Sequence, residues 1–151
     1  MSLLGLRLIY SIYYLYFYRL GRLHSTKPYN PECIRNEGLF YDAICHCDLK
    51  ILSEFKEDPT KTSSFTSVNW DFVKRCAKAV AATGNVDVMK IVTNVFLGES
   101  EKPTEIGEIF ALETINSGRP AMVVGLLHHW SITRNPLVSF INKQLYTFFS
   151  W

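Results

Sequence analysis

Three groups of side chains have types and spacings that can support chemistry, and the densest is Cys45-His46-Cys47. Two thiolates and an imidazole are typical zinc ligands. On a helix, however, residues two apart project about 200° from one another, so both sulfurs reach one ion only if the helix unwinds. Structural zinc usually takes four ligands, and the further candidates, Cys33 and His24, follow no zinc-site spacing. We therefore predict packed cysteines beside an exposed histidine, with no metal and no other cofactor.

The adjacent histidines His128 and His129 are the second group, and they suggest acid–base chemistry. Neighbouring helical residues diverge by about 100°, and no Ser, Cys or carboxylate stands near them in a recognisable arrangement. Catalysis needs a nucleophile and an orienting group within mutual reach. No phosphate-binding loop or G-x-G-x-x-G motif occurs either. The sequence therefore predicts a non-enzymatic protein, with one of these histidines at a seam between helices and the other exposed.

The third group is basic. Lys74, Arg75 and Lys78 share one face of a helix by their i,i+3 and i,i+4 spacing, and Lys90 is expected on the next helix. Such a stripe can bind the phosphates of RNA; the alternative is a solvated surface. An acidic stretch follows that would oppose RNA: Glu99, Glu101, Glu105, Glu108 and Glu113. The four basic residues are the candidate RNA-binding site.

Charge is distributed unevenly along the 151 residues. The chain has 16 basic and 14 acidic residues, but residues 1–24 hold three arginines and no acid. Without them, 13 basic residues face 14 acidic ones, a net charge of −1. That balance excludes the strongly basic class of nucleic-acid-binding domain. Four cysteines in a chain of this length and 48% apolar content are expected to be reduced and packed, not a disulfide framework.

The elements that position these groups are helices. Between Trp70 and Leu97 the apolar residues follow a helical period, which Gly84-Asn85 interrupts as a left-handed cap and turn would. The pattern recurs around Gly118, and a helix pair repeated at the spacing from Gly84 to Gly118 is typical of helical-repeat solenoids. In this alignment Ile106 matches Phe72, Phe110 matches Cys76, and Leu126 matches Val92. The residues expected to be buried between pairs are Ala79, Val80, Val92 and Phe96, with Leu126 at the seam.

Flanking segments extend the pattern. A first helical unit is expected over 38–55, with its turn at Cys47-Asp48, and residues 56–67 are expected to form a solvated loop. Pro103 or Thr104 begins a helix, Pro120 lies just inside the next, and 137–151 form a last amphipathic helix. We predict an all-α fold of about five to seven helices, in antiparallel hairpins stacked as a short, right-handed α-solenoid over residues 39–151, either by itself or as part of a longer array.

Residues 1–24 differ from the rest. An acid-free, arginine-bearing, amphipathic segment has the composition of a mitochondrial transit peptide, and RLHST resembles the end of fungal presequences. The alternatives are a membrane anchor or interfacial helix and the first helix of the fold. The uncharged run Leu8–Tyr18 has 11 residues, whereas a bilayer span takes about 20. We predict a mitochondrial protein, in the matrix or associated with the inner membrane, with peripheral membrane contact through residues 1–20 and a linker over 25–38.

The segment CAKAVAATGNVDVMKIVTNVF resembles a pentatricopeptide-type or related tetratricopeptide-type unit, and the resemblance covers about residues 70–130. The matching features are the small Ala82 and Gly84 at the end of the first helix and Asn85-Val86-Asp87 at the start of the second. Such proteins are common among fungal mitochondrial factors for RNA maturation and translation. The resemblance implies a factor that binds organellar RNA or the mitochondrial ribosome.

A second function is left open by the charge balance. A helical protein–protein adaptor or assembly factor without RNA contact would use the C-terminal helix, which ends without a polar cap. Its candidate partner-binding residues are Phe148, Phe149 and Trp151.

Overall fold

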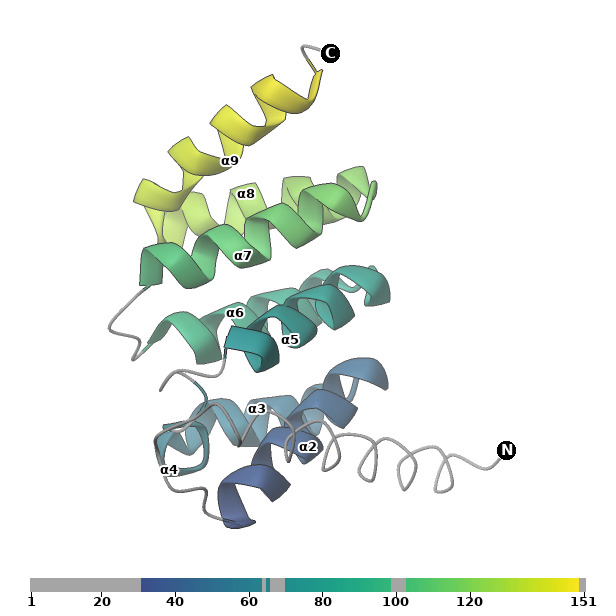
Figure 1. Ribbon diagram of the computed structural model, residues 1–151, viewed down its shortest axis with the longest axis vertical. Coiled ribbons are helices and arrows are strands. Elements are labelled where there is room, and N and C mark those ends of the chain that lie inside the picture. The colour runs from purple at the N-terminus through teal and green to yellow at the C-terminus, as the bar shows by residue number, and fades with distance from the viewer. Residues whose placement is uncertain (1–30, 64, 66–69, 99–102, 150–151) are drawn as a thin grey trace.

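The computed structural model describes residues 31–63, 65, 70–98 and 103–149, so the presequence predicted over 1–24 lies outside it. Over these ranges all regular structure is helical and no strand occurs, which confirms the all-α prediction. The helices are α2 (Pro31–Cys45), α3 (Leu49–Glu57), α4 (Pro59–Thr62), α5 (Trp70–Thr83), α6 (Val86–Gly98), α7 (Pro103–Asn116), α8 (Pro120–Thr133) and α9 (Asn135–Phe149) (Figure 1). None of them combines the length and the apolar composition needed to cross a bilayer.

The turn between α5 and α6 has the predicted form. Gly84 has φ 65°, the left-handed conformation that glycine adopts at no steric cost. On one side of it, the Thr83 hydroxyl donates to the Val80 carbonyl (2.6 Å) and accepts from the Asn85 N–H (3.2 Å). On the other, Asn85 Oδ1 accepts from the backbone N–H of Asp87 and Val88 at 3.0 and 3.2 Å, the hydrogen bonds of a helix N-cap.

The burial patterns of α5 and α7 correspond at the predicted spacing. Gly118, between α7 and α8, has φ 68°, as the alignment with Gly84 predicts. Every buried position of α5 has a buried counterpart in α7 at the spacing from Gly84 to Gly118. The pairs are Phe72/Ile106, Val73/Gly107, Cys76/Phe110, Ala77/Ala111, Val80/Thr114 and Ala81/Ile115. Val92, Phe96 and Leu126 are buried as predicted, whereas Ala79 is only half-buried because it lies at the edge of the buried stripe of α5.

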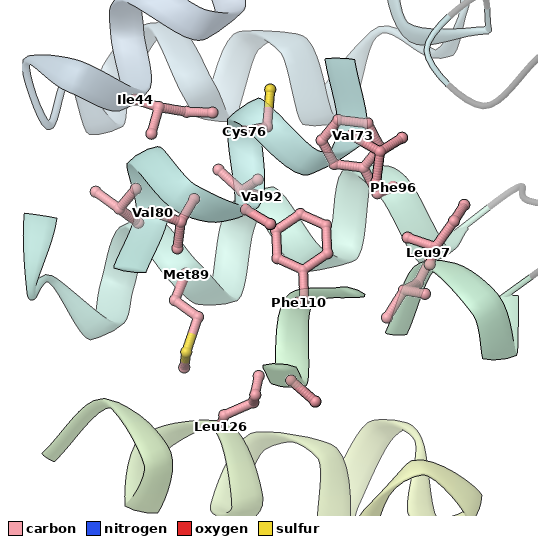
Figure 2. Packing of buried hydrophobic residues seen from close by; sticks show 14 of the residues in the cluster. Ile44, Val73, Cys76, Val80, Met89, Val92, Phe96, Leu97, Phe110 and Leu126 are labelled. Atoms are coloured by element: carbon pink, nitrogen blue, oxygen red, sulfur yellow. The ribbon is translucent and has the colours of Figure 1, made fainter. Parts of the chain in front are cut away.

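The helices form two layers (Figure 1). In the first layer, α2 packs on α5, α5 on α7, and α7 on α9; in the second, α3 packs on α6 and α6 on α8. Each of the three pairs α2–α3, α5–α6 and α7–α8 folds back through a short turn, and Cys47, with φ 52°, marks the first turn where predicted. Figure 2 shows apolar side chains between successive pairs, among them Met89, Phe110 and Leu126.

Two segment predictions are wrong. The linker predicted over 25–38 is helical from Pro31, because proline is tolerated in the first turn of a helix, where its missing N–H has no partner to lose. The solvated loop predicted over 56–67 contains the one-turn helix α4, and Phe65 is 0% exposed. The Phe65 ring lies 4.9 Å from Phe40 and 5.1 Å from Phe72, centroid to centroid, so this connection contributes to the core.

Candidate functional site

The cysteine cluster is spread over a helix end and a turn. Cys45 ends α2, whereas His46 and Cys47 lie in the turn that follows. His46 Nδ1 lies 2.9 Å from the Asp42 carbonyl oxygen and 3.3 Å from its carboxylate, so the histidine folds back on its own helix. No group of three His, Cys, Asp or Glu side chains in the described ranges is arranged to hold a metal, and Cys33 lies at the other end of α2. His24 is outside these ranges.

Two thiols of this region, those of Cys45 and Cys76, have raised pKa values. Burial raises the pKa of Cys45, although a hydrogen bond with Tyr41 lowers it in part. Burial also raises the pKa of the fully buried Cys76 well above its usual range, and the negative charge of Glu37 adds to the increase. A thiol is a nucleophile only as the thiolate. Both side chains therefore act as small apolar groups in the packing of α2 on α5.

The two histidines separate as predicted. His128 is exposed, whereas His129 is half-buried at the seam between α6 and α8. His129 Nε2 lies 3.1 Å from Asn94 Oδ1, and because the amide oxygen only accepts, the imidazole donates. Burial lowers the pKa of His129 below its usual value, and the positive charges of Lys90 and Lys56 lower it further.

This shift predicts a dependence of stability on pH. Between the lowered pKa of folded His129 and the usual value of about 6.5 in the unfolded chain, the unfolded chain binds more protons, so acidification destabilises the fold. We expect the free energy of unfolding of the wild-type protein, relative to that of His129→Gln, to fall between pH 7.5 and pH 5.5. Urea unfolding measures it. The exposed neighbour provides the control, since His128→Gln should keep the decrease; equal slopes for wild type and His129→Gln would contradict the assignment.

The four candidate RNA-binding residues do not form one patch. Lys74 and Lys78 are exposed one turn apart on α5, in the first layer. Arg75 is half-buried, and its charge reaches the thiol of Cys76 on the buried side of the helix. Lys90 lies on α6, in the second layer, where it acts on His129 together with Lys56. The hairpin places the two halves of the predicted site in different layers.

Acidic side chains lie on α7, the helix that packs on α5. Glu105 and Glu108 occupy in α7 the positions that Asp71 and Lys74 occupy in α5, and α7 packs directly on α5. Glu105 is exposed and Glu108 half-buried. The outer face of the first layer therefore carries charges of both signs.

A surface that sequence reasoning missed lies on α8. From Pro120 to Thr133 no Asp, Glu, Lys or Arg occurs, yet α8 is an outer helix with Val124 64% and Ile132 74% exposed. The clue was present in the sequence, because a surface helix normally combines an apolar face with a charged one. A helix without charges is expected to be buried on all sides, and α8 is not.

The structure describes the three C-terminal candidate residues for partner binding only in part. Phe148 and Phe149 end α9, but the structure describes neither side chain, and Trp151 lies outside it. The exposed positions that are described on α9 are mostly polar, and they include Ser139, Asn142 and Lys143, with Tyr146 the exception.

Comparison of the chain with protein-family models, with curated proteins and with solved structures finds no significant match.

Proposed function

We propose that this chain is a non-enzymatic helical-repeat protein, a short α-solenoid that binds a partner protein in the mitochondrial matrix or at the inner membrane. Three features support the solenoid: the helix pairs stack in order along the chain, the turns at Gly84 and Gly118 are equivalent, and buried positions recur at the spacing between these glycines. The location rests on the composition of residues 1–24.

The exposed apolar side chains of α8 carry the proposal of a protein partner. A helix of 14 residues with no fixed charge lies on the surface and exposes Val124 and Ile132. Exposed apolar side chains are candidates for contact with another protein, and these two lie on one face of α8, eight positions apart, with the exposed His128 between them. Such an apolar stripe would not bind the phosphate backbone of RNA, because phosphates are bound by positively charged side chains.

Binding of organellar RNA or of the mitochondrial ribosome is the second candidate function. Lys74 and Lys78 favour it, because both are exposed on one face of α5 at i,i+4 spacing. Two lysines beside Glu105 and Glu108 are a small phosphate-binding surface. The structure therefore gives more support to the protein partner.

Site-specific photo-cross-linking in intact cells tests the proposal. The full-length protein carries p-benzoylphenylalanine at position 132 on α8 or, as the matched control, at position 146, a strongly exposed aromatic position on α9. We expect a discrete protein adduct in the mitochondrial fraction from position 132 and none from position 146. Absence of an adduct at 132 would contradict the proposal.

The RNA alternative is tested by the salt dependence of RNA binding. If the purified protein retains RNA at low salt, its affinity should fall steeply as salt rises, since bound phosphates release counterions. Lys74→Ala combined with Lys78→Ala should then flatten the logarithmic salt dependence by about 1–2 units. That result without a protein adduct would replace the adaptor with the RNA-binding factor.

A further inference from the structure

The side of α6 that receives α8 shows how one helix of the second layer accepts the next. Met89 is fully buried and lies against Gly125 of α8, where its methyl carbon would be 3.6 Å from an added Cβ atom. Further along α6, the side chain of Asn94 accepts a hydrogen bond from His129. These contacts identify the face of α6 on which α8 packs.

The equivalent face of α8 has no described helix against it. At the spacing of the repeat, Met89 corresponds to Val123 and Asn94 to His128. Helix α8 packs on α6, α7 and α9, and within the described ranges no helix follows it in the second layer. Val123 is accordingly half-buried and His128 exposed. Figure 1 shows α8 and α9 at the end of the stack opposite α2 and α3.

Four residues form the middle of this face, and we call them the α8 edge: Val123, Val124, Leu127 and Ser131. At 100° per residue they fall within an arc of about 100°, along a helix about 20 Å long. Three of them are apolar, and Val124 is 64% exposed. The Ser131 hydroxyl donates to the carbonyl of the residue three positions before it (2.7 Å), so this donor keeps a partner when water is excluded.

The α8 edge is free of fixed charge. Helix α8 is the one described helix without Asp, Glu, Lys or Arg, and the two arginines that flank it turn back towards the α5–α6 pair. The guanidinium of Arg134 donates to the Leu97 carbonyl (2.9 Å), and that of Arg119 lies over Gly84. The neighbouring α9 carries one charged residue, the exposed Lys143. Because burial of an unpaired charge is costly, the α8 edge fits best against a surface that is also uncharged.

The opposite end of the stack does not offer such a surface. Helix α3, the second-layer helix at that end, exposes charged side chains of both signs: Lys50, Glu54, Lys56 and Glu57. Head-to-tail stacking of α3 on α8 would bring charged residues next to an uncharged face. A twofold axis instead brings a surface against its own copy, so an uncharged apolar edge meets another uncharged apolar edge.

We propose that the partner bound by α8 is a second copy of this chain, in a twofold-symmetric contact between the two α8 edges. This inference rests on the proposed partner-protein function and names that partner. In the dimer each α8 takes, on the other copy, the place that the next second-layer helix of the repeat would take. His128 and Ile132 flank the contact on the side facing solvent.

Sedimentation velocity of the full-length protein over a range of concentrations tests the proposal. We expect a reversible equilibrium between monomer and dimer. Val124→Glu should raise the dissociation constant of the dimer by about tenfold or more, because the symmetry places the new charge in the contact twice. Val124 is strongly exposed in the single chain, and circular dichroism shows whether the variant keeps its helices.

Controls carry the same new charge elsewhere. Lys143→Glu and Tyr146→Glu change exposed residues of α9, and both should leave the dissociation constant unchanged. Leu39→Glu changes a residue of α2 that is 50% exposed, at the opposite end of the stack, and it too should keep the dimer. Head-to-tail stacking would instead give oligomers larger than dimers and would be weakened by Leu39→Glu.

Three results would overturn the proposal: a protein that stays monomeric up to about 0.1 mM, a dimer that Val124→Glu does not weaken, or head-to-tail oligomers. The photo-cross-linking experiment separates this failure from that of the proposed function. A second copy predicts an adduct at position 132 with the mass of two chains. An adduct with a different protein, together with a monomeric chain, would reject the second copy but retain a partner protein; a monomeric chain without any adduct would reject both.

Discussion

Phe65→Ala is expected to lower the free energy of unfolding by about 3–5 kcal/mol, the range for removal of a buried phenylalanine ring. Phe65 is 0% exposed, and its ring centroid lies within 6.1 Å of the rings of Phe40, Phe55, Phe72 and Phe96. These four come from α2, α3, α5 and α6. Truncation would therefore leave a cavity where four helices meet, which none of them can fill alone.

Urea unfolding followed by circular dichroism measures this loss. Tyr146→Ala is the matched control, because it truncates an aromatic ring that is 79% exposed, and surface substitutions usually change stability by less than about 0.5 kcal/mol. A change in Phe65→Ala as small as that of the control would mean that residues 56–67 form the solvated loop that their composition predicts.

Residues 56–67, wrongly predicted as a solvated loop, show which structural features can be predicted from local sequence patterns. The pairs α5–α6 and α7–α8 were predictable because helical period, glycine turn and proline start are all local in the sequence. Phe65 is a lone aromatic residue among polar ones, and its burial depends on rings supplied by distant segments. No periodicity within 56–67 contains that information.

The candidate site was less predictable than the fold for a related reason. Lys74, Lys78 and Lys90 are close in sequence, but the turn at Gly84 places the first two in one layer and the third in the other. The basic neighbours of His129 include Lys90 and Lys56, which belong to two earlier helices, α6 and α3. Only the packing of α3 and α8 on α6 brings these groups together.

Gly84→Val is expected to lower the free energy of unfolding by about 2 kcal/mol, because φ 65° is strained for any residue with a Cβ atom and more so for a β-branched one. A Cβ atom at Gly84 would also meet the guanidinium of Arg119, but that side chain is exposed and its far end can move into solvent. Backbone strain should therefore account for most of the loss.

Gly118 supplies the comparison that tests the repeat itself. It has φ 68° and no atom within 4 Å of the position of its Cβ, so Gly118→Val should cost the same as Gly84→Val to within about 0.5 kcal/mol. Gly98 is the control, because it has neither positive φ nor a close neighbour, and Gly98→Val should be nearly neutral. If Gly84→Val were as mild as Gly98→Val, the left-handed conformation at Gly84 would not be required, and the repeat alignment would lose one of the two glycines on which it is built.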